Sequence, residues 1–140
     1  MAAAENKQLM HEIFDAVANG DRSKFVDHLA EHAVLTVTGE NSWSGVYRGK
    51  ASILRDLFGK VAELAPGART TRALRFLADD DWVVVEARGD MTTKAGAPYR
   101  NHYCLMYRIE NGMIVELKEY MDSALCERVL GRYPAERVPA

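Results

Sequence analysis

Long hydrophobic runs and cysteines are the features that this sequence has least of. No apolar stretch approaches the roughly 18 residues that a membrane helix needs, and the first residues lead into polar positions without the apolar core of a signal peptide. We therefore expect a cytoplasmic protein with no membrane partner. The two cysteines, Cys104 and Cys126, lack metal-ligand spacing. We expect them to be reduced thiols packed as small hydrophobic residues, with neither a disulfide nor a metal site.

Charge of one sign is not in excess either. The 18 Lys and Arg and the 20 Asp and Glu residues are scattered along 140 positions and give a formal net charge of -2. Because nucleic-acid binding needs a concentrated basic surface, we expect no nucleic-acid partner. The composition, 48% hydrophobic and 27% charged, is typical of a globular protein with one core. We expect a single domain over residues 1–131 and an irregular tail at 132–140.

Apolar periodicity and turn residues predict nine elements. Four segments have the period of amphipathic helices: residues 9–17, 22–29, 50–65 and 122–130. Five segments have strand composition: residues 33–38, 70–78, 82–91, 99–109 and 113–121. Residues 39–48 are predicted to form a loop that carries Trp43, and Asn111-Gly112 predicts a tight hairpin turn. The order is α-α-β-α-β-β-β-β-α, with the last four strands forming antiparallel hairpins.

Several short motifs accompany this element order. They are Asn19-Gly20-Asp21, Tyr47-Arg48-Gly49, the stretch 99–103, and Glu119-Tyr120-Met121-Asp122. Together with the element order they resemble the SnoaL-like branch of the nuclear transport factor two superfamily, and the resemblance covers nearly the whole chain. It implies an α+β fold of the cystatin-like roll type, in which a cone-shaped, curved antiparallel sheet is wrapped by three to four helices around an apolar pocket. It does not choose among the activities that this fold supports.

The resemblance also allows two known mechanisms to be compared with this sequence. The ketosteroid isomerase mechanism needs a carboxylate base and oxyanion donors, but the matching positions fall on Val37, Ile13 and Leu105. We therefore do not expect that mechanism. The limonene-type epoxide hydrolase pattern is Asp-Arg-Asp, which Arg88-Gly89-Asp90 and Glu119 match in part. The positions that orient water in that family fall on Leu35 and Val37, which cannot form side-chain hydrogen bonds.

Alternation along a strand sorts side chains into two faces. In residues 99–109 and 113–121 the odd-numbered positions form the expected cavity face, with Glu119 the lone acid among apolar residues of its strand. The strand 82–91 leaves two alternatives. On composition alone its charged set would face solvent, whereas the resemblance turns Arg88 and Asp90 into the cavity beside Glu119.

These patterns favour a small-molecule enzyme that performs acid–base chemistry without a cofactor, as a hydrolase, cyclase, isomerase or dehydratase acting on a largely apolar substrate. Glu119 and Asp90 would share the acid and base roles, and Arg88 would tune them. The candidate ligand-binding residues are Leu35, Val37, Trp43, Asn101, Tyr103, Leu105 and Met121. The alternative is a non-catalytic ligand-binding or scaffold dimer of the same fold. In either case we expect a homodimer through the outer sheet face, which carries His102, Cys104, Met106, Ile114 and Tyr120.

Overall fold

The computed structural model describes residues 2–134, which form a strongly curved sheet with helices over its concave side. The helices are α1 (Ala2–Val17), α2 (Ser23–Asp27), α3 (Lys50–Ser52), η1 (Ile53–Phe58), α4 (Gly59–Leu64) and α5 (Ser123–Leu130). The strands are β1 (Leu29–Val37), β2 (Gly45–Arg48), β3 (Thr70–Asp79), β4 (Trp82–Thr92), β5 (Pro98–Tyr99), β6 (His102–Glu110) and β7 (Met113–Tyr120).

The strands lie in the order β2-β1-β7-β6-β4-β3, and β5 adds a short pairing to β4. All neighbours are antiparallel except β1 and β7, which run parallel, with Val37 beside Glu119. The prediction of a purely antiparallel sheet is therefore wrong at this one junction. A parallel pair needs a long crossover connection, and here the chain between β1 and β7 supplies it with the α3–α4 helix and five strands.

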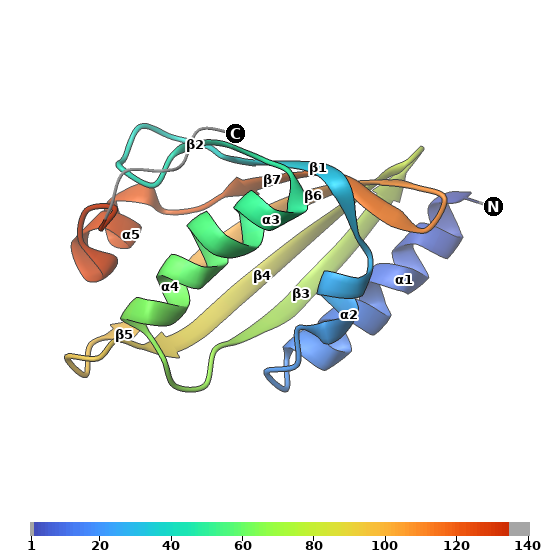
Figure 1. The fold of residues 1–140 in the computed structure, drawn as a ribbon. Coiled ribbons are helices and arrows are strands. Elements are labelled where there is room, and N and C mark those ends of the chain that lie inside the picture. The colour runs from blue at the N-terminus through green and yellow to red at the C-terminus, as the bar shows by residue number, and fades with distance from the viewer. Residues whose placement is uncertain (1, 135–140) are drawn as a thin grey trace.

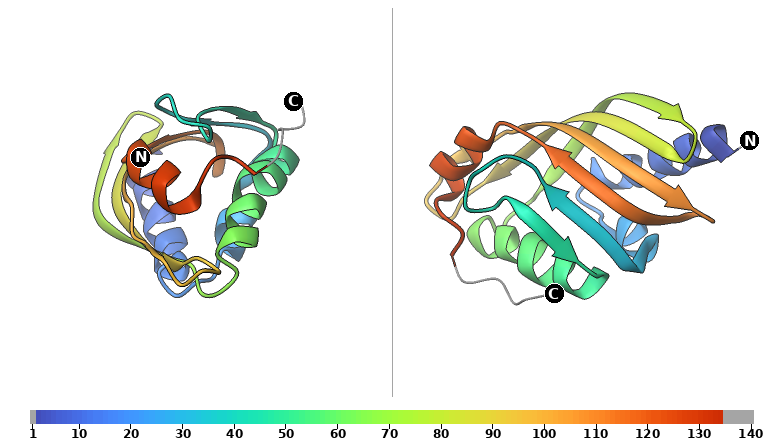
Figure 2. Two further views of the ribbon diagram at one scale, coloured as in Figure 1. Left: turned by 90° about the vertical axis from the view of Figure 1, so that its left-hand side faces the viewer. Right: turned by 90° about the horizontal axis from the view of Figure 1, so that it is seen from above.

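The helices enclose the concave side of the sheet (Figure 1). Helix α1 packs against β3 and β4. The segments α3, η1 and α4 follow one another without a break as one helix, which lies across the concave side of the sheet from α1 (Figures 1 and 2). The end-on view in Figure 2 shows sheet and helices surrounding a central axis, with α5 across one end. The apolar faces of these elements are buried together, with Met10, Ile13, Leu35, Ile53 and Val85 at most 1% exposed. This burial is the main stabilising contribution to the fold.

Most predicted elements are present with small shifts of their ends. Asp122 caps α5 by accepting a hydrogen bond from the Leu125 N–H at 3.0 Å, and Asn111 and Gly112 both have positive φ angles, as a two-residue hairpin turn requires. Strand β2 lies within residues 39–48, where only a loop was predicted. The predicted strand 99–109 is divided, because residues 100 and 101 leave the ladder between β5 and β6.

The structure decides between the two faces of β4. Val83, Val85, Ala87 and Gly89 point inward, whereas Arg88 and Asp90 are exposed on the convex side. The β4–β6 register runs unshifted from Trp82 to Arg88, so alternation holds these charged side chains outside. Asp90 pairs there with Arg100 at 3.2 Å. The expectation that Arg88 and Asp90 lie in the cavity beside Glu119 is therefore wrong.

A bulge changes the outer face of β7. The β6–β7 register shifts between Arg108 and Ile109, and as a result both Ile114 and Val115 are buried. Ile114, which was expected on the outer face, is 0% exposed.

Two other expectations concern cysteines and the chain end. Both cysteines are free, as predicted, but Cys104 is exposed and Cys126 is buried. Residues 132–134 follow α5 without helix or strand, and the rest of the predicted tail lies outside the described residues. None of the helices in residues 2–134 is long and apolar enough to cross a membrane.

Candidate functional site

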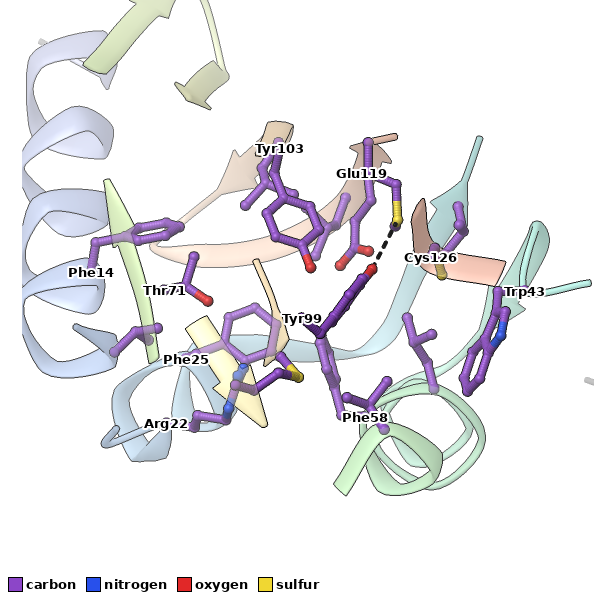
Figure 3. Close-up of a pocket in the computed structure, with 18 of the residues that line it drawn as sticks. Phe14, Arg22, Phe25, Trp43, Phe58, Thr71, Tyr99, Tyr103, Glu119 and Cys126 are labelled. Carbon is purple, nitrogen blue, oxygen red and sulfur yellow. Dashed lines mark hydrogen bonds between the residues drawn. The ribbon is translucent and has the colours of Figure 1, made fainter. Parts of the chain in front are cut away.

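A cavity of about 100 Å³ lies between the sheet and the helices. The sheet contributes mainly apolar side chains to its wall: Val37, Met91, Leu105, Leu117 and Met121. The helices contribute a second apolar set: Ile13, Phe14, Val17, Phe25, Leu57 and Phe58. A few polar groups interrupt this lining, and the close-up in Figure 3 shows several of them turned toward the cavity. A concave, mostly apolar pocket with few polar groups is the usual form of a small-molecule site.

Glu119 is the acid of this pocket. Strand β7 holds it between Val37 of β1 and Leu105 of β6, and its backbone carbonyl accepts hydrogen bonds from the Thr38 N–H at 3.0 Å and the Thr38 hydroxyl at 2.9 Å. Its odd-numbered position on β7 turns the carboxyl inward, as predicted. Among the described residues, none donates a hydrogen bond to this carboxyl, so it remains available to a bound molecule.

Burial changes the ionisation of Glu119. Loss of hydration raises the pKa of its carboxyl to about 7, against a smaller opposing effect of the positive charge on Arg22. At neutral pH the protonated and ionised forms are therefore both populated. A carboxyl in this state can accept or donate a proton, which is what general acid–base catalysis requires.

Three tyrosines surround Glu119 on the cavity side. Tyr103 and Tyr107 extend from β6, and Tyr99 extends from β5. Burial raises the pKa of all three hydroxyls, so they stay neutral and keep their protons. The Tyr99 hydroxyl donates a hydrogen bond to Sδ of Met121 at 3.8 Å. Figure 3 shows the oxygens of Tyr99, Tyr103 and Glu119 turned toward one another. The arrangement gives a bound oxygen atom hydrogen-bond donors close to the carboxyl.

Gly89 explains how the Tyr103 ring is accommodated. A Cβ atom at this position would lie 3.1 Å from Cε2 of Tyr103, which is tighter than ordinary van der Waals contact. The glycine therefore lets the ring lie close against β4. This is the role the structure gives to the middle residue of Arg88-Gly89-Asp90.

Arg22 is the second charged residue of the pocket lining. It directly precedes α2, and its guanidinium lies over the Phe58 ring, 5.6 Å from the ring centroid. Burial lowers the pKa of the guanidinium, and repulsion from Arg69 adds to this effect. In Figure 3, Arg22 and Glu119 enter the pocket from opposite sides. Arg22 therefore supplies the positive charge that sequence analysis assigned to Arg88.

Asn101 has a structural role in place of the predicted ligand contact. It is 0% exposed and is not part of the pocket lining. Its amide donates to the Tyr99 hydroxyl at 2.8 Å and to the Asp122 carbonyl at 3.0 Å. Its side-chain oxygen accepts from the backbone N–H groups of His102 at 2.8 Å and Asp122 at 3.1 Å. With its hydrogen-bonding capacity used, Asn101 positions Tyr99 and the start of α5.

The other candidate ligand-binding residues divide clearly. Five of them line the pocket: Val37, Trp43, Tyr103, Leu105 and Met121. Leu35 is 0% exposed in the core and lies outside the lining. Trp43 is held by its indole N–H, which donates to the Gly131 carbonyl at 2.9 Å. The loop after β1 and the end of α5 are thereby joined at this side of the pocket.

Sequence reasoning missed Arg22, and it did not select Tyr99, Tyr107 or Cys126, which also line the pocket. Tyr99 and Tyr107 belong to the odd-numbered set already assigned to the cavity face. Arg22 also had a local signal, because it precedes the buried Phe25 by three residues and so shares its side of the chain. Within the described part of the chain, no group of three or more His, Cys, Asp or Glu residues could hold a metal ion.

The amino-acid sequence of this chain is similar to a protein family and to several known proteins. A model of the SnoaL-like domain family matches residues 10–117. The uncharacterized protein Rv0034 of Mycobacterium tuberculosis strain H37Rv is 27% identical over 120 residues, which cover 85% of this chain and 91% of that protein.

Solved structures share the fold at low sequence identity. Bal32a, from a soil-derived mobile gene cassette, has a TM-score of 0.80 and 20% identity over 93% of this chain and 99% of its own. A putative SnoaL-like polyketide cyclase from Jannaschia sp. CCS1 has a TM-score of 0.75 and 12% identity over 94% and 95%. Similar structures also include proteins described as NTF2-like and as having a cystatin-like fold. The predicted fold class is therefore confirmed.

Proposed function

The chain belongs to the SnoaL-like domain family, and from that premise we propose that it is an enzyme that transfers a proton to or from a small, largely apolar molecule bound in the pocket. The observation that carries the proposal is Glu119. Among the described residues it is the one carboxyl in the pocket lining, and burial raises its pKa to about 7. A carboxylate is costly to bury without hydrogen-bond donors, and perturbed carboxyls in pockets are enriched at active sites.

The surrounding residues suit proton transfer next to a carbonyl group. Ionised Glu119 would remove the proton from the carbon beside the carbonyl. The hydroxyl of Tyr103 would donate a hydrogen bond to the oxygen on which negative charge develops. The proton held by Glu119 would then be returned to the same or another atom of the substrate. This sequence uses the chain's own side chains and needs no cofactor.

Similar structures carry names of different activities and do not specify a substrate. One of the similar structures is described as a putative polyketide cyclase, and another, from Streptomyces galilaeus, as a putative hydroxylase. We therefore leave the reaction among the cyclases, isomerases, dehydratases and hydrolases. We also propose that the protein acts in the cytoplasm, where Cys104 and Cys126 would stay reduced.

Hydrogen–deuterium exchange tests the proposal without knowledge of the natural substrate. Propiophenone in D₂O should exchange its α-protons faster with the protein than with buffer alone, as followed by ¹H NMR. The rate should rise with pH through about 7, because ionised Glu119 is the proposed base. Glu119→Gln should abolish the acceleration, whereas Asp90→Asn, at the exposed carboxyl outside the pocket, should retain it. Equal rates for the wild type and Glu119→Gln would contradict the proposal.

A non-catalytic ligand-binding dimer is the second candidate. It would use the same pocket and the same outer sheet face, where Tyr120 is 43% exposed and Cys104 is exposed beside it in the β6–β7 ladder. We propose that this face forms a homodimer interface. If the protein bound small molecules but accelerated no proton exchange in a panel that also included an epoxide such as styrene oxide, the binding function would replace the enzymatic one.

A further inference from the structure

We propose that the molecule bound in this pocket carries an anionic oxygen group, such as a carboxylate, and that Arg22 holds this group while the apolar body of the molecule lies toward Glu119. This inference rests on the proposed function only in placing the ligand in the same pocket. It names a substrate class, a small amphipathic anion, and gives Arg22 a specificity role.

The first support is the unused hydrogen-bonding capacity of Arg22. Its guanidinium carries five N–H donors. Its one specific contact with a described side chain is with the Phe58 ring, and no described residue accepts a hydrogen bond or forms an ion pair with the guanidinium. The ring contact leaves the edge of the guanidinium available, and that edge is the part that binds a carboxylate through two parallel hydrogen bonds.

The second support is the free-energy cost of burying the positive charge of Arg22. Burial lowers the pKa of the Arg22 guanidinium, and the nearby positive charge of Arg69 lowers it further. Arg69 itself is held by the backbone carbonyls of Ala65 and Gly67. Asp21 is adjacent in sequence, but its carboxylate is turned to the Ser23 N–H at 2.9 Å. Glu119 is the carboxyl whose charge opposes these effects, and with a pKa of about 7 it is only partly ionised at neutral pH. A buried positive charge that is only partly compensated is expensive, and a bound anion would lower that cost.

The third support is where Arg22 lies. The lining residues Arg22, Phe58, Val61 and Thr71 are all half-buried and come from the start of α2, the α3–α4 helix and the start of β3. Val37, Leu117 and Cys126, on the other side, are buried. Tyr103, Glu119 and Met121 are also half-buried, so the pocket is partly accessible from both sides, and Arg22 lies at one of its accessible edges. A charged group held by Arg22 would stay near water, with the apolar part inside.

The cavity volume limits the size of the ligand. A cavity of about 100 Å³ is smaller than the apolar cavities of roughly 150 Å³ that hold benzene, so the enclosed part of a ligand can be no larger than a single ring, with the charged group lying at the accessible edge beside Arg22. Phenylacetate and phenylacetamide are therefore suitable probes. They have the same shape and differ in charge, so their comparison isolates the contribution of the anion.

The charge of Glu119 predicts the pH dependence of binding. The groups that influence or are influenced by its charge are Arg22 before α2, Tyr103 and Tyr107 of β6, and Cys126 of α5. The tyrosines and the thiol stay neutral at pH 7, because burial raises their pKa values. Ionised Glu119 would repel an anion, so phenylacetate should bind more tightly at pH 6 than at pH 8, and phenylacetamide should bind equally at both.

The experiment is a titration of each probe followed by ¹H–¹⁵N NMR of the wild type, Arg22→Met and Arg88→Met. The wild type should prefer phenylacetate, and Arg22→Met should weaken phenylacetate binding by about 10- to 100-fold, the range expected for loss of a charge-assisted pair. Phenylacetamide binding should change less than about threefold. Arg88→Met removes an exposed arginine outside the pocket and should change neither affinity. Arg22→Gln serves as a second variant if Arg22→Met does not fold.

Three results would overturn the inference: no measurable phenylacetate binding to the wild type, equal weakening of both probes by Arg22→Met, or no weakening of either. These outcomes are separate from the fate of the proposed enzyme. Charge-selective binding without catalysed proton exchange would leave Arg22 as the anion site of a binding protein. Proton exchange without charge selectivity would retain the enzyme and remove the anionic substrate.

Discussion

Among single residues, Glu119 combines an ionisable group with a mostly apolar enclosure. The pocket raises its pKa to about 7, because the ionised form loses its hydration and no described residue donates a hydrogen bond to it. A carboxyl whose pKa is higher in the folded state than in the unfolded state stabilises the fold at low pH. That contribution is lost as the pH rises from the unfolded pKa through the folded pKa.

This linkage predicts that Glu119→Gln stabilises the protein at high pH. Glutamine keeps the size of the side chain but never ionises, so the stability gained relative to the wild type should grow between pH 4 and pH 8. A shift from 4.5 to about 7 corresponds to about 3 kcal/mol. Urea unfolding at several pH values measures the difference. A constant difference between variant and wild type across this range would show that Glu119 is not ionising in a buried site.

Among the elements, β5, β6 and α5 are joined through Asn101. Its side chain satisfies two backbone N–H groups and one backbone carbonyl, and it also holds the Tyr99 hydroxyl. The side-chain hydrogen bonds of Asn101 thus stabilise the chain at residues 100 and 101, where it leaves the β ladder. The position of Tyr99 in the pocket depends on this support.

Asn101→Ala should therefore destabilise the fold by about 2 kcal/mol, because it removes four hydrogen bonds of a fully buried side chain, three of them to partly buried backbone groups. The exposed Asn19, whose amide donates to the Asp15 carbonyl at 3.0 Å, provides the control. Asn19→Ala should cost no more than about 1 kcal/mol. Thermal or urea unfolding compares the two variants, and equal small losses would contradict the structural role of Asn101.

The same elements show what the sequence could predict. Local signals located α5 through its Asp122 cap and the β6–β7 hairpin through Asn111-Gly112. Alternation placed Glu119 and Tyr103 in the pocket. The parallel β1–β7 pairing was not predictable in this way, because it joins strands far apart in sequence. Arg88 and Asp90 were misplaced because a partial motif match was given weight against the charged composition of their face of β4.

For the whole molecule, the curved sheet gives two surfaces with different uses. The concave surface and the helices enclose the pocket, and the convex surface carries the exposed Tyr120 and Cys104. Large exposed hydrophobic side chains on a sheet face are often covered by a partner. Because Ile114 is buried, the proposed interface would centre on β6 and the end of β7.

We predict a homodimer at micromolar concentration, with a mass by light scattering after size exclusion of twice that of the chain. Tyr120→Glu should shift the equilibrium toward the monomer, since it places a charge within the proposed interface. Lys24→Glu changes an exposed residue of α2 on the helical side and should leave the dimer intact. A wild-type monomer would exclude this interface. Equal effects of the two substitutions would show that Tyr120 is not part of the dimer interface.

The ionisation of Glu119 within the intact pocket tests the central claim most directly. Selective ¹³C labelling of glutamate allows the Glu119 side-chain carboxyl to be followed by NMR from pH 4 to pH 9, with assignment by comparison to Glu119→Gln. We predict a midpoint near pH 7 for this one signal, set by burial with Arg22 acting in the opposite direction. A midpoint near the ordinary glutamate value of 4.5 would mean that water reaches the carboxyl freely, and it would contradict the assignment of Glu119 as a proton-transfer group at neutral pH.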